Sequence, residues 1–319
     1  MSFYLREPLN VAERSPAKVD WEECACLLCG GSSWSPLVGA PDRGRGGKGL
    51  WFMVVQCHDC GLCFTNPRPS AHGIAPFYSQ DYAPQQIREG HGPRWWHRLP
   101  LLGRRPNQAR KTLRLHGQGR LLDFGCGSGS FLTRMRQQGW QVTGLEVSEE
   151  VVERLRTKLG LRALAGSLPH ADLENASFDV ITMWQSLEHV HQPLEVLASA
   201  RELLAPGGRL IVAVPNIDSL AFRWFGSAWT GLDLPRHLIH FTPETLRLML
   251  QRAGFRAGRV AMVRRGSWLR ASARLAAHHF PSQSRWCRWL QGRSTASAAS
   301  WYAYWTRQAD CLLVSATRR

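Results

Sequence analysis

The sequence of 319 residues lacks the features that mark membrane-spanning, secreted and repeat proteins. No apolar run approaches the roughly 20 residues that a transmembrane helix needs. The first residues do not show the basic-then-apolar order of a signal peptide, and no internal repeat is visible. We therefore expect a cytoplasmic protein with one large domain and room for a smaller one.

Acidic residues are scarce. Asp and Glu number 24 against 40 Lys and Arg, which gives a formal net charge of +16 and a pI near 10.3. A strongly basic surface favours nucleic acid, anionic lipid or acidic small molecules as partners, although it names none of them. Arginine-rich composition can also reflect codon usage in a GC-rich genome, so charge alone leaves the partner open.

Residues 121–130 are the most informative stretch, because an apolar run ends there on Asp123 and is followed by three alternate glycines. The run predicts a buried strand, and the apolar spacing of residues 130–138 predicts a helix. Gly125, Gly127 and Gly129 remove the side chains from one face of the intervening turn, so a ligand can lie against bare backbone. Such a turn alone is weak evidence, since many nucleotide-binding folds use one.

A second apolar run over 141–146 ends on Glu146, which lies 23 residues after Asp123. An acid at the end of the second strand is placed to accept hydrogen bonds from both ribose hydroxyls of an adenosine ligand. A dinucleotide dehydrogenase would usually show G-x-G-x-x-G with no acid at the end of the first strand, whereas this chain has D-x-G-x-G-x-G.

Strand and helix patterns alternate over 119–319, which predicts a parallel sheet covered by helices on both faces. Thr242 and Pro243 should open a later helix as its N-cap and first residue. The expected strands lie near 120–124, 140–146, 162–166, 178–185, 208–215, 256–263 and 310–316, and the expected helices near 130–138, 148–159 and 193–204.

Four blocks, 121–132, 144–148, 178–190 and 203–210, resemble those of class I S-adenosylmethionine (SAM)-dependent methyltransferases and occur in that family's order. The resemblance implies a doubly wound α/β fold with a seven-stranded, mostly parallel, Rossmann-like sheet. It also implies SAM as the cofactor, with Ser167 and Leu168 beside the adenine and Gln185 or Trp184 covering the other side of the ring. The expected SAM site comprises Asp123, Gly125, Gly127, Gly129, Glu146, Ser167, Leu168 and Gln185.

Two C-x-x-C-G units near the N-terminus supply the four thiolates of a tetrahedral zinc site: Cys26, Cys29, Cys57 and Cys60. Cys24, Cys63 and His58 lie close enough in sequence to compete as ligands. A closed four-cysteine site has no open position, so this zinc should fold the segment and take no part in chemistry. Redox or vestigial thiols are the alternative, and a disulfide suits a cytoplasmic chain poorly.

The expected organisation is a loose arm over 1–20, a zinc-knuckle module over 21–70, a bridging helical segment over 71–118 and the SAM-binding domain over 119–319. Zinc knuckles followed by residues 60–69 and 77–79 resemble the N-terminal part of bacterial methyltransferases of sugar, polysaccharide and natural-product pathways. Cys63 departs from that pattern, which usually has an apolar residue there.

An insert at about 264–308 combines tryptophan with arginine at helical spacing. This composition suits an interfacial helix on anionic lipid. It equally suits a substrate lid, a dimer contact or ordinary packing. The insert therefore allows a peripheral contact with an anionic membrane. Because it could equally form a dimer contact, the oligomeric state is left open.

Methyl transfer from a sulfonium needs an acceptor held in line and relieved of its proton. Residues after the fourth and fifth strands should face that acceptor. We choose His237 as the general base, because imidazole titrates near neutral pH, and His189 and Glu188 next. The pair Glu188 and His189 can instead simply shape the start of a helix. Three such groups could also hold a divalent ion, as suggested for some quinone O-methyltransferases that residues 187–190 resemble.

The sequence therefore predicts a methyltransferase acting on a small molecule: a sugar, a natural product or a lipid-linked precursor. An RNA-modifying enzyme is an alternative, but the basic residues of the zinc-knuckle module are few, so a nucleic acid partner is not expected. A non-catalytic SAM-binding protein is a further alternative, against which the intact Asp123, glycines and Glu146 argue.

Overall fold

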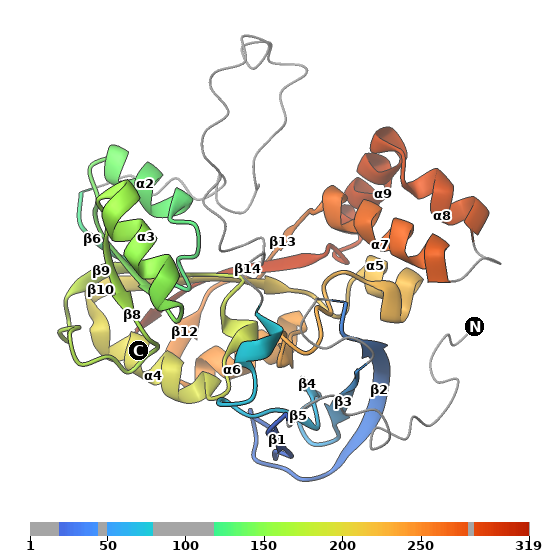
Figure 1. Cartoon of the computed structure of the whole chain (residues 1–319), viewed down its shortest axis with the longest axis horizontal. Helices are drawn as coiled ribbons and strands as arrows, with labels where there is room; N and C mark the ends of the chain where they lie inside the picture. Colours follow the sequence, from blue (N-terminus) through green and yellow to red (C-terminus); the bar gives the residue numbers. More distant parts are fainter. Residues whose placement is uncertain (1–18, 44–49, 79–117, 280–283, 319) are drawn as a thin grey trace.

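The computed structural model of the chain describes residues 19–43, 50–78, 118–279 and 284–318. The expected N-terminal arm lies almost wholly outside these ranges, and so do residues 79–117 of the expected bridging segment. Figure 1 shows a long central sheet with helices on both sides and a second, smaller group of strands packed against one side of it.

The central sheet has the strand order β12-β14-β10-β9-β6-β7-β8. The five strands from β10 to β8 pair in parallel, while β14 runs antiparallel to both of its neighbours. The mostly parallel sheet is as the sequence predicts. Its strands are β6 (Arg120–Phe124), β7 (Gln141–Glu146), β8 (Arg162–Ala165), β9 (Phe178–Trp184), β10 (Leu204–Pro215), β12 (Phe255–Ala257) and β14 (Cys311–Arg318).

Helices cover both faces of this sheet, which makes the fold doubly wound. Helices α2 (Ser130–Gln137) and α3 (Glu149–Leu159) pack on the face that carries Leu121 and Val180. Helices α4 (Pro193–Leu203) and α6 (Pro243–Arg252) pack on the opposite face with Leu122 and Ile181. Alternation of adjacent residues between two faces is the period-2 geometry of a strand, and both faces are apolar because both are buried.

Capping residues set the ends of two of these helices. Ser148 accepts a hydrogen bond from the backbone N–H of Val151 at the start of α3, and Gly160 ends that helix in the left-handed region. Thr242 and Thr245 form a reciprocal capping box at the start of α6, with Pro243 at its first position. The predicted start of this helix is confirmed.

The sixth predicted strand is interrupted, so the sheet has eight strands and not seven. Residues of β12 pair with 316–318 of β14, and those of β13 (Ala261–Val263) pair with 311–313. Three residues, 258–260, therefore stand opposite two. Gly258 donates its N–H to the carbonyl of Ser315, and a Cβ at Gly258 would lie 2.9 Å from that oxygen. The break is a bulge that the close approach of two backbones requires.

The smaller sheet has the order β11-β4-β3-β2, and one of its strands comes from the far half of the chain. Strands β2 (Trp34–Pro41), β3 (Trp51–Cys57) and β4 (Cys63–Thr65) are consecutive, but β11 (Ile239–His240) follows β10 of the central sheet. A separate pair, β1 (Trp21–Glu22) and β5 (Arg68–Pro69), lies beside them. Val55 and Phe64 share one apolar core with Leu238 and Phe241. The N-terminal segment is thus bound to the chain that follows β10.

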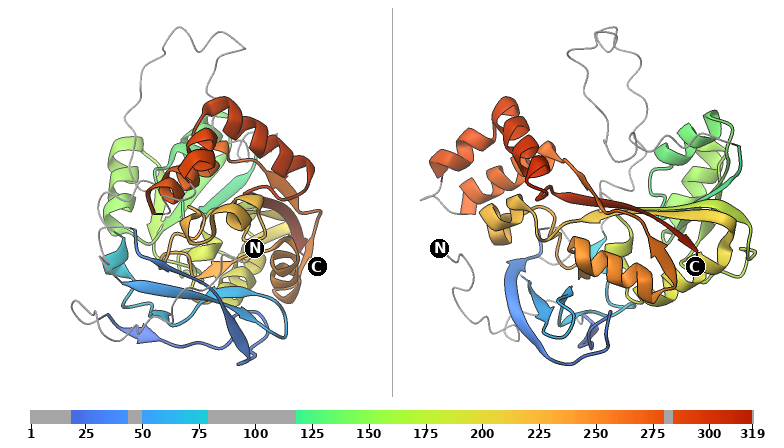
Figure 2. Two further views of the ribbon diagram at one scale, coloured as in Figure 1. Left: turned by 90° about the vertical axis from the view of Figure 1, so that its right-hand side faces the viewer. Right: turned by 180° about the vertical axis from the view of Figure 1, so that it is seen from behind.

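The predicted insert forms three helices, α7 (Gly266–His279), α8 (Ser284–Leu290) and α9 (Arg293–Trp305). They pack on one another, and α7 also packs on α5 (Leu220–Phe225). Figure 2 shows them at one end of the molecule, beyond the end of β13 and the start of β14. Within the described ranges, no helix combines the length and apolarity needed to cross a bilayer.

A buried arginine joins the N-terminal segment to the connection between β10 and β11. Arg236 Nη1 lies 3.1 Å from Asp42 Oδ1 and Nη2 lies 2.7 Å from Asp233 Oδ1, and the same guanidinium donates to the carbonyl of Phe77. The side chains of Arg236 and Asp42 are 4% and 0% exposed. Since a charge buried this deeply must be paired, Asp42 and Phe77 of the N-terminal segment are held to the segment that carries Arg236.

Replacing Asp42 with Ala should therefore destabilise the protein, because it leaves Arg236 buried with one carboxylate fewer. We expect a loss of roughly 2–3 kcal/mol in the free energy of unfolding, measured by urea denaturation. Asp218 is the matched control, since its ion pair with Arg223 has both side chains about half exposed. Asp218→Ala should cost under about 1 kcal/mol. Equal losses of unfolding free energy in the two variants would show that the buried ion pair contributes no more to stability than the exposed one.

Candidate active site

The glycine-rich turn joins β6 to α2, and its backbone is left-handed at all three glycines. Their φ angles are 69°, 51° and 67° at Gly125, Gly127 and Gly129. A side chain at Gly125 would also place its Cβ 2.7 Å from the Cβ of Ser186. The turn thus needs glycine for its own shape, and the result is a stretch of bare backbone at the carboxyl end of β6.

Glu146 stands at the end of β7 and is tied to this turn. Its Oε2 accepts a hydrogen bond from the N–H of Gly127 at 2.9 Å, and its Oε1 accepts from the N–H of Val147 at 3.0 Å. The backbone N–H of Gly166, just after β8, donates to the carbonyl of Glu146. Three adjacent strand ends are therefore bound together, with a fixed carboxylate among them, which is the arrangement that an adenosine ligand requires.

The other residues expected at the SAM site differ in how their side chains are used. Ser167 is exposed beside the end of β8, whereas Leu168 is buried in the apolar core. Asp123 is fully buried and accepts a hydrogen bond from Thr182 Oγ1 at 2.6 Å. Gln185 donates its side-chain N–H to the carbonyl of Ala213 at 2.9 Å, so its amide is directed toward β10. Asp123, the glycines, Glu146 and Ser167 all lie at the carboxyl ends of β6, β7 and β8, while the side chains of Leu168 and Gln185 contact the protein interior.

The predicted acceptor-side residues come together although they are far apart in sequence. Glu188 and His189 lie in the short 3-10 helix η5 (Leu187–His189) that follows β9. The carbonyl of Glu188 accepts a hydrogen bond from the N–H of Leu238 at 2.8 Å, which brings His237 alongside. One ligand atom from each of Glu188, His189 and His237 lies within 4.8 Å of the others. The sequence therefore names a real side-chain cluster.

Hydrogen bonds to carbonyl oxygens fix the tautomers of both histidines. His237 Nδ1 lies 2.9 Å from the carbonyl of Gly231, and His189 Nδ1 lies 2.9 Å from the carbonyl of Arg236. A carbonyl can only accept, so each Nδ1 carries the proton and each Nε2 keeps its lone pair. Burial lowers the pKa of His237, and burial with the neighbouring His237 lowers that of His189 to about 3. Both rings are neutral at pH 7.

Asp233 is a member of the cluster that the sequence analysis missed. Its Oδ2 lies 4.0 Å from His237 Nε2, the same distance that separates this nitrogen from Glu188 Oε1. Burial would raise the pKa of Asp233, but His237 and Arg236 outweigh it and hold the pKa below its usual value. Burial raises the pKa of Glu188 to about 8. At pH 7 an ionised and a protonated carboxyl thus flank His237. The signal was an acid four residues before the histidine.

Tyr78 is a second missed residue, and it comes from the N-terminal segment. Its hydroxyl lies 2.9 Å from His189 Nδ1. Burial raises its pKa, so the phenol stays protonated. No local pattern around residue 78 indicates this contact, because it depends on how the two sheets pack.

A pocket of about 260 Å³ lies beside the cluster. Its walls come from the N-terminal segment (Ala40, Pro41 and Arg43), from residues 230–236 and from Leu275 of α7. Asp233 lines this pocket and also faces His237. A small molecule in the pocket would therefore meet the carboxylate that adjoins the candidate base.

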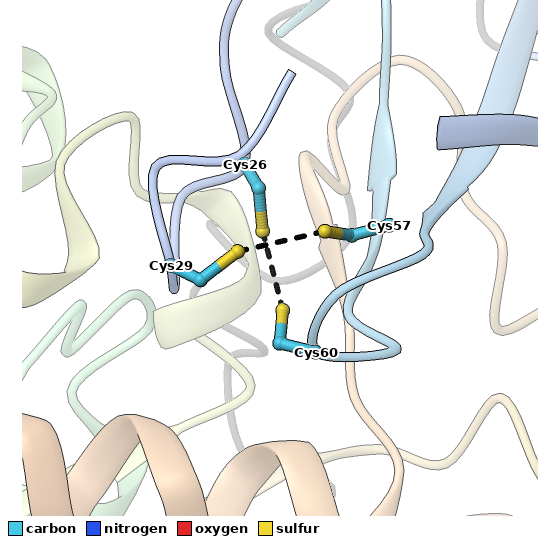
Figure 3. A group of neighbouring side chains, drawn as sticks. All are labelled: Cys26, Cys29, Cys57 and Cys60. Atoms are coloured by element: carbon cyan, nitrogen blue, oxygen red, sulfur yellow. Dashed lines mark hydrogen bonds between the residues drawn. The ribbon is translucent and has the colours of Figure 1, made fainter. Parts of the chain in front are cut away.

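The four cysteines of the two C-x-x-C-G units converge with their sulfurs inward (Figure 3). The Sγ atoms of Cys26 and Cys60 lie 3.4 Å apart, and those of Cys29 and Cys57 lie 3.5 Å apart. Zn–S bonds of about 2.3 Å in a tetrahedron place sulfurs about 3.8 Å apart, close to these values. Cys24, Cys63 and His58 are not part of this group. The set of four that the spacing predicts is the set that the fold assembles.

Comparison with known proteins agrees with this geometry. Residues 95–258 match the family model described as a methyltransferase domain. The chain belongs to this methyltransferase family. It is 32% identical over 167 residues to a ubiquinone biosynthesis O-methyltransferase of Vibrio cholerae, a match covering 47% of this chain and 68% of that protein. It is 30% identical over 201 residues to the protein of the same name from Xanthomonas axonopodis, covering 57% and 84%.

A solved SAM-dependent methyltransferase from Mesorhizobium loti is 21% identical, with a TM-score of 0.46, over 66% of this chain and 96% of that one. The chain is a class I SAM-dependent methyltransferase, as its sequence blocks indicate. The bare glycine turn and the fixed carboxylate of Glu146 fit SAM, and we propose that Glu146 holds the ribose hydroxyls.

Glu146→Ala should weaken SAM binding by about 2–3 kcal/mol, since it removes hydrogen bonds to a charged acceptor. Titration calorimetry measures this loss directly. The matched control is Glu149→Ala, which removes an exposed acid three residues away and should leave SAM affinity unchanged. Unaltered affinity in a folded Glu146→Ala protein would refute the assignment.

Proposed function

We propose that this enzyme transfers the methyl group of SAM to a hydroxyl oxygen of a small molecule, with His237 as the general base. The observation that carries the proposal is the free lone pair of His237 Nε2, held between two carboxyl groups at 4.0 Å. The names of the two relatives, both O-methyltransferases, support oxygen as the acceptor atom.

SAM, when bound, supplies a methyl group that is already activated as a sulfonium. The work left to the chain is to orient the acceptor and take its proton. His237 Nε2 takes the hydroxyl proton, while Gly231 holds the opposite nitrogen. The ionised carboxylate of Asp233 stabilises the imidazolium that results. His189 is a positioning residue, because it contacts the carbonyl of Arg236 and the ring of His237. Tyr78 is a positioning residue one step further out, because its hydroxyl contacts His189 Nδ1.

The pocket beside Asp233 is the proposed acceptor site. Leu232, Leu234 and Leu275 make part of its lining apolar, and Arg43 adds one cation. A volume of about 260 Å³ suits a single small ring system or the head of a larger lipid-linked molecule. A pocket of this size encloses a small molecule whole, so the small-molecule acceptor is the better match.

His237→Ala should leave SAM affinity near wild type and lower turnover by about 100-fold or more. The assay follows labelled methyl from SAM onto a panel of phenols, sugars and lipid-linked precursors. His278→Ala, which removes an exposed histidine of α7, serves as the control and should be fully active. If His237→Ala keeps its turnover, the base lies elsewhere; if it loses SAM binding as well, the segment around it is part of the cofactor site.

Turnover should depend on pH through the protonation of His237. His237 is the base only when neutral, and burial lowers its pKa from the ordinary 6.5. Wild-type turnover should therefore be level across neutral pH and fall only in acid, below the usual imidazole range.

The second candidate mechanism uses a divalent ion bound by Glu188, His189 and His237. Both histidine Nε2 atoms keep their lone pairs. Among the described residues, neither side-chain oxygen of Glu188 has a hydrogen-bond partner. Such an ion would bind the acceptor oxygen and favour its ionised form. Loss of turnover in chelator, restored by Mg²⁺ or Zn²⁺, together with an inactive Glu188→Gln, would favour the ion. Full activity of the chelator-treated enzyme and of Glu188→Gln would favour His237 acting as the base without a metal ion.

We also propose that the four clustered thiolates bind a structural zinc ion. All four positions of the tetrahedron come from protein, so no position is left for substrate. The amides after each knuckle support the turn, as the N–H groups of Gly30 and Gly61 donate to the carbonyls of Cys26 and Cys57. Binding free energy at such a site is folding free energy.

Cys57→Ser should lose the metal and expose the N-terminal segment to protease. Metal analysis of the purified protein should find about one zinc per chain in the wild type and almost none in the variant. Cys24→Ser is the control and should keep its zinc, because that thiol lies outside the cluster. A wild-type protein that is free of metal under reducing conditions would contradict the proposal.

A further inference from the structure

Helices α8 and α9 present large aromatic side chains to solvent, and nothing in the proposed chemistry uses them. Trp289 and Trp305 are the most exposed, at 63% and 73%. Aromatic residues normally bury their rings, so a group of them on one outer element marks an interaction surface. We call the exposed aromatic and arginine residues of these two helices the outer face, with the members Arg285, Trp286, Arg288, Trp289, Arg293, Trp301, Tyr302, Tyr304 and Trp305.

The last turns of α9 have two distinct sides. Ala296, Ser300 and Ala303 are buried at helical spacing; Trp301, Tyr302 and Trp305 occupy the opposite side, and Tyr304 lies on the flank between them. On α8, Cys287 and Leu290 are buried while Trp286 and Trp289 are exposed. Small or apolar residues hold each helix to the protein. Trp289 and Trp305 are the most exposed aromatic residues of the two helices, while Trp286 keeps one ring face on Phe225 of α5.

The charge around these residues has one sign. Residues 264–308 contain eight arginines and no aspartate or glutamate. Arg285, Arg288 and Arg293 are exposed beside the tryptophans. Tryptophan and tyrosine among arginines, with no acid to oppose an anionic surface, is the composition of helices that lie in the headgroup region of an anionic bilayer.

Two other occupants fit less well. Bases of single-stranded RNA need open aromatic faces. The Trp301 ring stacks on Trp305 at 5.6 Å and has the Arg264 guanidinium 3.5 Å from its centroid, and Trp286 stacks on Phe225 at 5.3 Å. A second copy of the chain would bring an equally basic face against this one, and like charges would repel.

We propose that the outer face docks on an anionic membrane surface. Helix α7 connects this contact with the active site, because it packs against both α8 and α9 and also supplies Leu275 to the pocket wall. An acceptor whose polar head protrudes from the bilayer would then be presented near the pocket. The docking itself does not depend on which acceptor the enzyme methylates, so it can be tested without one.

The experiment is flotation of the full chain with vesicles of phosphatidylcholine mixed with phosphatidylglycerol, against vesicles of phosphatidylcholine alone. Wild type should float with the anionic vesicles only, and raising the salt concentration should reduce the bound fraction because it screens the arginines. Trp289→Ala/Trp305→Ala should lower the partition coefficient about tenfold or more, since two apolar rings no longer enter the interface.

Matched variants separate location from composition. Trp34→Ala/Trp51→Ala removes two exposed tryptophans from the smaller sheet and should float like wild type. Arg285→Gln/Arg293→Gln should weaken flotation, whereas Arg247→Gln/Arg252→Gln makes the same charge change on α6 and should not. Circular dichroism and thermal unfolding show that each variant is folded.

Three outcomes overturn the proposal. Wild type that stays unbound with anionic vesicles at low salt rules out docking. A folded Trp289→Ala/Trp305→Ala protein that floats like wild type places the contact elsewhere. Wild type that ignores vesicles but binds single-stranded RNA, or forms a dimer by light scattering, each lost in that variant, assigns the face to one of the other occupants.

Discussion

The buried guanidinium of Arg236 is the contact on which the site depends. It binds Asp42 of the smaller sheet, Asp233 of its own segment and the carbonyl of Phe77. Its own carbonyl oxygen receives the Nδ1 proton of His189, and the next residue along the chain is His237. Residue 236 therefore contacts the N-terminal segment through its side chain and His189 through its backbone. The desolvation of a charge makes the geometry strict, because any displacement would leave it unpaired in the interior.

Cofactor site and fold share atoms in a similar way. The carboxylate of Glu146 accepts from Gly127, and the left-handed glycines are required by the turn and by the neighbouring Ser186. The same features that we assign to ligand binding are needed for β6, β7 and α2 to meet. Substituting these glycines would change the shape of the turn, whatever its ligand.

Local pattern was enough to predict the strands of the central sheet, the helices on its faces and the cysteine cluster. Each rests on short-range signals: apolar runs, a capping Thr242 and the two-residue spacing of the thiols. The bulge at Gly258 was not predictable, since it depends on the carbonyl of Ser315 across the sheet. His237 was chosen from the chemistry of imidazole, and the fold places it with Glu188 and His189. Asp233 was missed although it lies only four residues before His237. Tyr78 was missed because its contact with His189 depends on packing between segments far apart in sequence.

The two-residue strand β11 limits how the N-terminal segment could be removed or exchanged. Ile239 and His240 pair with Phe64 and Cys63, and the carbonyl of Leu238 accepts from Thr65 while its N–H donates to Glu188. The N-terminal segment is thus woven through the catalytic half and is no detachable appendage. Recombination that exchanged it for a foreign module would strip a strand partner from the residues around His237. A shortened chain beginning at β6 would also lose the part of the pocket wall that Ala40, Pro41 and Arg43 supply.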